Sequence, residues 1–93
     1  MSTRLKFPAG QLVATPGALA AIEASGDSLF TYLQRHLAGD WGDVDAHDRR
    51  ENEFSLEQGF RLLSAYCLRN GVKIWIITEA DRTNTTVLLP DEY

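Results

Sequence analysis

Residues 60–89, FRLLSAYCLRNGVKIWIITEADRTNTTVLL, decide the fold class of this chain. Three apolar runs in this stretch are separated by Asn70-Gly71 and by the polar residues 81–84, and both separators have the composition of turns. Asn-Gly is typical of a two-residue hairpin turn, because both residues tolerate the positive φ that such a turn requires. The stretch therefore predicts a three-stranded antiparallel meander.

The turns also predict a register for the meander. A two-residue turn at Asn70-Gly71 sets Arg69 opposite Val72. The same register pairs Cys67 with Ile74, Ala65 with Ile76 and Leu63 with Thr78 on one face, and Tyr66 with Trp75 on the other. The second turn, at residues 81–84, places Val87 beside Thr78 and Leu89 beside Ile76. Both faces are apolar in this arrangement, so we expect the helices to divide between them or one face to bind another chain.

The N-terminal part of the chain predicts one short strand and one short helix. A strand-like run at residues 10–15 leads into Pro16. Thr15 can accept a backbone N–H as a helix cap, and Pro16 suits the first helical position because its missing N–H would have no partner there. We therefore expect a helix over residues 16–24, stopped by Ser25-Gly26.

Apolar residues spaced three and four apart predict a second helix over residues 29–37, begun at Asp27 or Ser28 and ended by Gly39. His36 lies on the apolar side of this helix. A lone histidine in such a position is typically packed with its ring nitrogens satisfied, so we expect a core residue and not a ligand.

Residues 45–58 are polar, rich in opposite charges and compatible with a third helix that ends at Gly59. A competing signal is Ser55-x-x-Gln58, a capping-box pattern that would start a helix running through Leu63. The two interpretations exclude each other. We favour the helix that ends at Gly59, because the residues after it pair so readily as a strand; residues 55–63 stay open between helix and strand entry.

The length of 93 residues predicts a single small domain, residues 1–93, and the composition, 44% hydrophobic and 24% charged, is typical of a globular chain. The single cysteine, Cys67, has no second cysteine with which to form an intramolecular disulfide. It lies in an apolar run, which predicts a buried side chain. No apolar run is long enough to span a bilayer, so we expect a cytoplasmic protein that makes no membrane contact. The predicted fold class is α+β, with two or three short N-terminal helices packed on the C-terminal meander and an optional extra N-terminal strand.

Residues 39–48 hold the highest density of carboxylates in the chain, with Asp40, Asp43, Asp45 and Asp48 beside His47. An EF-hand calcium loop needs a glycine at its sixth position and a glutamate at its twelfth, and no register here supplies both. We therefore expect no bound metal, and a turn whose aspartates cap and charge the next helix. Trp41 either anchors this loop or, if exposed, contacts a partner.

The formal net charge of −4 opposes non-specific attraction to nucleic acid, so we expect no direct DNA binding. Arg49-Arg50 is the only adjacent basic pair, and the acidic residues around it largely neutralise its field.

No glycine-rich phosphate loop is present, and Cys67 has no histidine base beside it in the sequence, so we expect no enzymatic activity and no cofactor. The alternative is a small hydrolase that uses His47 with Asp48, Glu79 or Asp81. The residues that we select as candidates for binding are Trp41, Asp43, Arg49, Arg50, Asp81 and Arg82.

Three segments carry a family resemblance: GQLVATPGAL at residues 10–19, RHLAGDWGD at 35–43, and IWIITEADR at 74–82 followed by TTVLLPDEY at 85–93. Together they resemble a family of small bacterial proteins encoded on plasmids and other mobile elements, some of which are labelled subunits of type I restriction-modification systems. The chain lacks the length and the Asn/Asp-Pro-Pro-aromatic motif of a DNA methyltransferase subunit. The resemblance implies a mobile-element accessory protein and transfers no functional residue.

These observations favour a protein-interaction or regulatory module, whose partner is another protein or a second copy of the chain. One version of this hypothesis is an inhibitor of a host nucleic-acid machine that acts through an acidic surface. The hydrolase is the alternative from another functional class.

Overall fold

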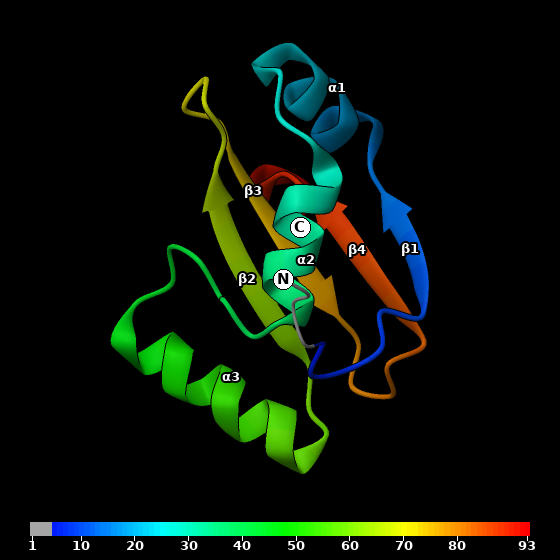
Figure 1. Ribbon diagram of the computed structural model, residues 1–93, viewed down its shortest axis with the longest axis vertical. Helices are drawn as coiled ribbons and strands as arrows, with labels where there is room; N and C mark the ends of the chain where they lie inside the picture. The colour runs from blue at the N-terminus through cyan, green and yellow to red at the C-terminus, as the bar shows by residue number, and fades with distance from the viewer. Residues whose placement is uncertain (1–4) are drawn as a thin grey trace.

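The computed structural model of the chain describes residues 5–93 (Figure 1). Its elements, in chain order, are β1 (Gln11–Ala14), α1 (Pro16–Ser25), α2 (Leu29–Leu37), α3 (Ala46–Gln58), β2 (Leu62–Cys67), β3 (Lys73–Thr78), β4 (Asn84–Leu88) and the short 3-10 helix η1 (Pro90–Glu92). None of the helices in this part of the chain combines the length and the apolarity needed to cross a bilayer.

The caps read from the sequence set the helix boundaries. The side chains of Thr15 and Asp45 each accept a hydrogen bond from the backbone N–H three residues further on, and α1 and α3 begin directly after them. Ser28 occupies the N-cap position of α2, but its side chain makes no capping hydrogen bond. Gly59 ends α3, so the alternative helix start at Ser55 is wrong.

The four strands form one mixed sheet in the order β1-β4-β3-β2 (Figure 1). Strands β2, β3 and β4 are antiparallel neighbours, as the meander requires, but β1 pairs with β4 in parallel. The α+β class is confirmed, whereas a purely antiparallel three-stranded sheet is wrong. The N-terminal strand is an integral edge of the sheet, and η1 adds a helical turn after the last strand, so the helices are not all N-terminal.

The predicted register of the first hairpin is wrong by one residue. Leu68 donates to the carbonyl of Val72, and Gly71 donates to the carbonyl of Leu68, so three residues and not two make the loop. Gly71 has φ +86, the left-handed conformation that a three-residue hairpin loop needs at its last position. The Asn-Gly signal located the turn correctly but did not distinguish the two loop lengths.

This one-residue difference exchanges the two faces of β2. The observed pairs across β2 and β3 are Leu62 with Thr78, Leu63 with Ile77, Ser64 with Ile76, Ala65 with Trp75, Tyr66 with Ile74, and Cys67 with Lys73. The large side chains of Leu62 and Tyr66 therefore face the core, which buries more apolar area than Leu63 and Cys67 would. The expected burial of Cys67 is wrong, because this register leaves it exposed.

The second turn differs from its predicted register by two residues. Val87 pairs with Ile76 and Thr85 pairs with Thr78, instead of Val87 with Thr78. A shift of two residues preserves the side-chain alternation, so Val87 still faces the core as expected.

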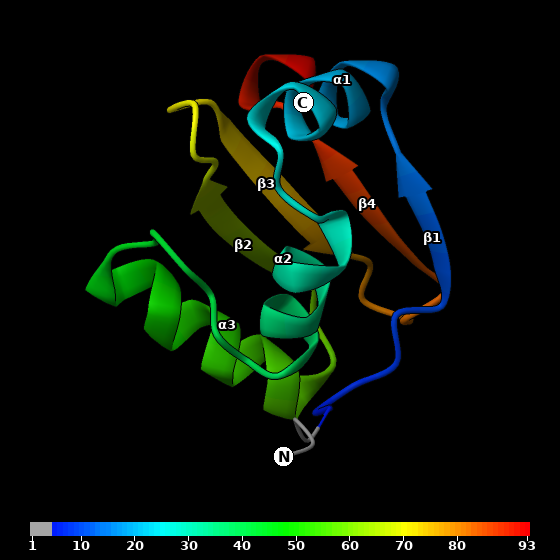
Figure 2. The same cartoon turned by 45° about the horizontal axis from the view of Figure 1, so that its top comes forward.

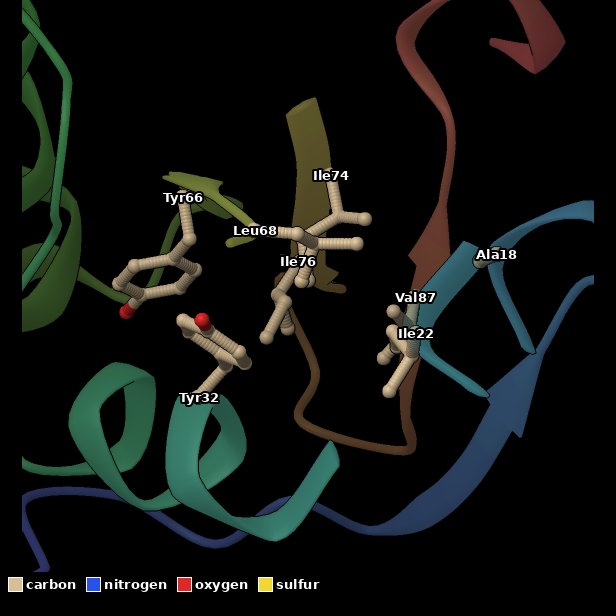
Figure 3. Close-up of a cluster of buried hydrophobic side chains, with 8 residues drawn as sticks. All are labelled: Ala18, Ile22, Tyr32, Tyr66, Leu68, Ile74, Ile76 and Val87. Atoms are coloured by element: carbon tan, nitrogen blue, oxygen red, sulfur yellow. The ribbon is translucent and has the colours of Figure 1, made fainter. Parts of the chain in front are cut away.

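One face of the sheet carries the main apolar core, and α1 and α2 both cover it (Figures 1 and 2). Figure 3 shows Ala18 and Ile22 of α1 and Tyr32 of α2 directed toward the strands. The buried cluster is completed by Tyr66, Leu68, Ile74, Ile76 and Val87. The helices therefore do not divide between the two faces.

The other face of the sheet is covered in part by the C-terminal residues. η1 lies against β3, and the ring of Tyr93 packs edge-on against Trp75 with 5.7 Å between centroids. The guanidinium of Arg61 lies over the Tyr93 ring and bonds to its hydroxyl. Ile77 and Leu88 are also buried on this face, which has no long helix over it.

A chain of buried hydrogen bonds crosses the core side of the sheet. The imidazole of His36, with no exposed area, lies 2.5 Å from the Ser64 hydroxyl through Nδ1 and 2.9 Å from the Thr78 hydroxyl through Nε2. Thr78 lies 2.7 Å from the hydroxyl of Thr85, which donates to the carbonyl of Ala9. The prediction that His36 is a satisfied core residue is confirmed.

The Ala9 carbonyl at the end of this chain determines the direction of its hydrogen bonds as far as Nε2 of His36. The Thr85 hydroxyl donates its only hydrogen to the Ala9 carbonyl, so it must accept from the Thr78 hydroxyl. Thr78 must then accept from Nε2–H of His36. Burial, together with the charge of Arg82, lowers the pKa of His36 to about 3, so the ring is neutral and its Nδ1 accepts from the Ser64 hydroxyl.

The outer edge of β2 is closed by two segments from outside the sheet. The Asn52 side chain of α3 donates to the Leu63 carbonyl at 2.7 Å and accepts from the Leu63 N–H at 3.1 Å. Ala65 donates to the Trp41 carbonyl and accepts from the Asp43 N–H. These four hydrogen bonds replace a neighbouring strand, which places α3 beside the sheet.

Gly42 makes the close approach to Ala65 possible. Its φ is +73, and a Cβ at this position would overlap the Ala65 carbonyl and the Tyr66 ring. A glycine is therefore required between Trp41 and Asp43 for the loop to bridge to β2.

The neutral state of His36 predicts a loss of stability in mild acid. Below about pH 6.5 the unfolded chain protonates this histidine while the folded chain does not, until the pH approaches 3. The free energy of unfolding should therefore fall by about 1.4 kcal/mol per pH unit below 6.5. Urea unfolding between pH 7 and 5 measures this slope, in a range above the ordinary pKa of the carboxylates.

The matched variants are His36→Gln and His47→Gln. The first should be less stable at pH 7 and nearly flat from pH 7 to 5, whereas the second, at an exposed histidine, should keep the wild-type slope. An undiminished slope in His36→Gln would contradict the assignment.

The Asn52 amide predicts a second stability effect. Asn52→Leu leaves the N–H and the carbonyl of Leu63 without partners at a partly buried edge, so we expect a loss of about 2–4 kcal/mol in unfolding free energy. Gln58→Leu, at an exposed position of the same helix, should change it by less than about 0.5 kcal/mol. Equal effects of the two variants in urea denaturation would disprove the role of the amide.

Candidate functional site

α3 presents more of its surface to solvent than α1 or α2 does. It is held by caps at both ends, and on its inner side only Asn52 and Ser55 are buried, with Leu56 half-buried against a small apolar cluster. A helix secured by caps and by one amide does not need a wide apolar stripe. Its outer face is therefore available for contacts.

Two phenylalanines form an exposed aromatic pair at the C-terminal end of α3. Phe54 and Phe60 are each 53% exposed, and their ring centroids lie 5.9 Å apart. The Phe60 N–H donates to the Ser55 carbonyl beyond Gly59, which is the Schellman arrangement, and an apolar contact such as this one accompanies that motif. The contact accounts for the pairing of the rings but leaves about half of each ring in water.

Two shallow depressions lie along the same helix. The first is lined by His47, Arg50, Glu51 and Phe54. The second, between the helix and β2, is lined by Asp48, Glu51, Asn52, Ser55, Arg61 and Leu63. We define the α3 surface as His47, Arg50, Glu51, Phe54, Phe60 and Arg61. It combines an aromatic centre with charged groups of both signs at its rim.

Trp41 is not part of this surface. Only 1% of its area is exposed, its ring stacks near Phe7 and meets His36 edge-on, and its N–H donates to Glu53 at 2.6 Å. The tryptophan anchors the loop to the core, which was one of the two interpretations of the sequence. Its selection as a contact residue is wrong, because a buried ring cannot reach a partner.

The other selected residues near α3 are exposed. Asp43 contributes its backbone N–H to the β2 edge and leaves its side chain in water. Arg49 and Arg50 lie in the first turns of α3, and Arg50 lines the first depression. The structure therefore brings Arg50 to the α3 surface and leaves Asp43 outside it.

Asp81 and Arg82 belong to the turn between β3 and β4. Asp81 accepts hydrogen bonds from the hydroxyl and the N–H of Thr83, and these bonds lower the pKa of its carboxyl. Asp81 thus stabilises its own turn, as a residue of a solvated hairpin tip does.

Arg82 holds several loops together. Its guanidinium donates to the carbonyls of Phe60, Ser55, Glu79 and Ala80 at 2.7–3.2 Å. Four carbonyls from two separate turns thus converge on one planar cation, which joins the end of α3 to the β3–β4 turn. Arg82 is a structural residue, and the sequence gives no sign of it, because its partners are backbone atoms.

The carboxylates of residues 40–48 do not form one free acidic face. Asp40 is paired with Arg35 at 2.8 Å, and this bond lowers the pKa of its carboxyl. Asp45 caps α3, and Asp48 lies 3.5 Å from His47. Asp45, His47 and Asp48 could bring ligand atoms within 4.8 Å of one another, but all three are exposed and the positive end of the α3 dipole opposes a cation there.

The alternative hydrolase site is assembled only in part. His47 lies near Asp48 and, at 3.6 Å, near Glu51. Glu79 and Asp81 belong to the turn that Arg82 fixes to the Ser55 carbonyl, and Ser55 follows His47 by about 12 Å of helix. The carboxylates of this turn therefore lie at the opposite end of α3 from His47.

Ser64 and His36 have the contact of a nucleophile and its base, but both are fully buried and the third group is Thr78, not a carboxylate. No substrate can reach them in this fold, so we assign the pair to the core. The sequence did not indicate this network, because its members lie in four different elements.

Comparison with protein-family models, curated proteins and solved structures gave no match to this chain.

The role assigned to Arg82 predicts a specific cost of substitution. Arg82→Lys keeps the charge but loses the planar fork, so we expect a loss of about 1–3 kcal/mol in unfolding free energy. Arg50→Lys, an exposed change on α3, should stay within about 0.5 kcal/mol of the wild type. Urea denaturation compares the two, and an unchanged midpoint for Arg82→Lys would contradict a structural role.

Proposed function

We propose that this chain is a non-enzymatic module that binds a protein partner through the α3 surface. The observation that carries the proposal is the aromatic pair of Phe54 and Phe60, which remains about half exposed on a helix that the core barely uses. Interface centres are enriched in aromatic residues and arginine, and their contact residues commonly surround a few such anchors.

The chemistry of the α3 surface indicates the kind of partner. Its centre would receive an apolar side chain lying against the two rings. Arg50 and Arg61 would pair with acidic groups beside that side chain, and Glu51 would pair with a basic one. A folded protein surface or a helix with an apolar centre and a mixed polar rim meets this description.

Nucleic acid fits the surface less well. The arginines are interleaved with Asp48 and Glu51, and the whole chain has a net charge of −4. The resemblance of residues 10–19, 35–43 and 74–93 to proteins of mobile elements extends the proposal: the module would regulate a protein of the element or of its host.

The test is capture of partners on the tagged chain from a nuclease-treated bacterial lysate, with quantification by mass spectrometry. A partner should be retained after nuclease, and Phe54→Ser should reduce its retention about tenfold or more, as loss of an interface anchor does. Phe30→Ser is the matched control, because Phe30 is 65% exposed at the start of α2 and not on α3.

The control variant should retain the partner at the wild-type level, and circular dichroism should show both variants folded. Loss of capture on nuclease treatment, or full retention by Phe54→Ser, would contradict the proposal.

A further inference from the structure

The two edges of the sheet differ in the hydrogen bonding of their outward backbone groups. The outward N–H and carbonyl groups of Leu63 and Ala65 on β2 are all hydrogen-bonded, by Asn52 and by the loop at Gly42. β1 is the other edge strand, and Figures 1 and 2 show it at the border of the molecule with no element beyond it. The fold therefore closes the β2 edge at Leu63 and Ala65 and leaves the β1 edge open.

Backbone alternation identifies the open groups on β1. Gln11 donates to the carbonyl of Thr83, directly before β4, and Thr15 donates to the carbonyl of Val87 in β4. The N–H and carbonyl groups of Leu12 and Ala14 therefore point away from the sheet, and no loop or side chain within residues 5–93 bonds to them. An unpaired edge of this kind is a template for another strand.

Edge strands are usually protected by their short length, by lysine or proline, by a bulge or by a covering segment. β1 is short, with four residues, but it has none of the other protections, since residues 11–14 carry no charge and no proline and keep a regular register against β4. The whole stretch from Phe7 to Ile22 lacks a charged side chain. A second copy of this strand would meet no electrostatic repulsion there.

We propose that β1 pairs with β1 of a second copy of this chain, antiparallel and about a two-fold axis at Val13. Leu12 then lies opposite Ala14 of the other copy, and the same pair recurs on the other side of the axis. The four outward backbone groups of each copy are satisfied, and the two sheets become one. This interface is independent of the α3 surface.

The side chains fit this register. Leu12 and Ala14 share the core face, so a large residue faces a small one in both pairs. Val13 lies on the opposite face with 44% of its area exposed, and its own copy would face it across the axis at a non-hydrogen-bonded position. β-branched residues pack well in such cross-strand contacts.

Four residues make a short junction, so the dimer should form in a concentration-dependent manner. Sedimentation velocity of the wild-type chain over a range of concentrations tests this. We expect monomer and dimer in exchange, and a chain that stays monomeric up to its solubility limit would overturn the proposal.

Substitutions at the axis test the register. Val13→Lys and Val13→Glu each place like charges opposite one another, and each should weaken self-association about tenfold or more. Because the axis sets position 13 opposite itself, an equimolar mixture of the two variants should associate again. Gln11→Lys is the matched control, since it adds the same charge on the same exposed side of β1 but opposite Thr15 of the other copy.

The control should associate as the wild type does. Unchanged association of Val13→Lys would show that the copies meet at another surface, and failure of the mixture to recover would exclude a two-fold axis at Val13. Either result would overturn the proposal, and far-ultraviolet circular dichroism establishes that every variant is folded.

Discussion

The hydrogen-bond chain through His36 is the constraint on which the rest of the structure depends. It joins α2 to β2 and β3 through Ser64 and Thr78, and continues to β4 and to the segment before β1 through Thr85. Every donor in it has one acceptor, so a shift of any strand by one residue would leave a buried polar group unpaired at a cost of about 1–3 kcal/mol.

The contacts that close the β2 edge also determine the position of α3. The helix contributes almost no apolar area to the main core, and it is held beside the sheet by the Asn52 amide, the contact of Trp41 with Glu53, and the carbonyls gathered by Arg82. Directional polar contacts can fix a helix without covering its surface. This explains why α3 has an exposed outer face and why its aromatic pair is the most prominent apolar feature there.

The candidate site shows how tertiary contacts reassign polar residues. Trp41, Asp81 and Arg82 have the residue types of binding sites, but each makes contacts within the chain. Trp41 packs in the core, Asp81 accepts hydrogen bonds in its own turn, and Arg82 donates to backbone carbonyls. Of the predicted set, Arg50 belongs to the α3 surface, together with Phe54, Phe60 and Arg61. The signal that could have indicated the phenylalanines is the apolar contact that accompanies a helix ended by glycine.

The sequence by itself determined the elements of this protein and most of their boundaries, because caps, turn residues and apolar spacing act over a few neighbouring residues. Thr15, Asp45 and Gly59 are effective wherever the helices are packed. Only the tertiary structure decided which side of β2 is buried, which partner β1 takes and what Arg82 does. Those outcomes depend on loop length, on the area buried by Leu62 and Tyr66, and on backbone carbonyls that come together only after the chain has folded.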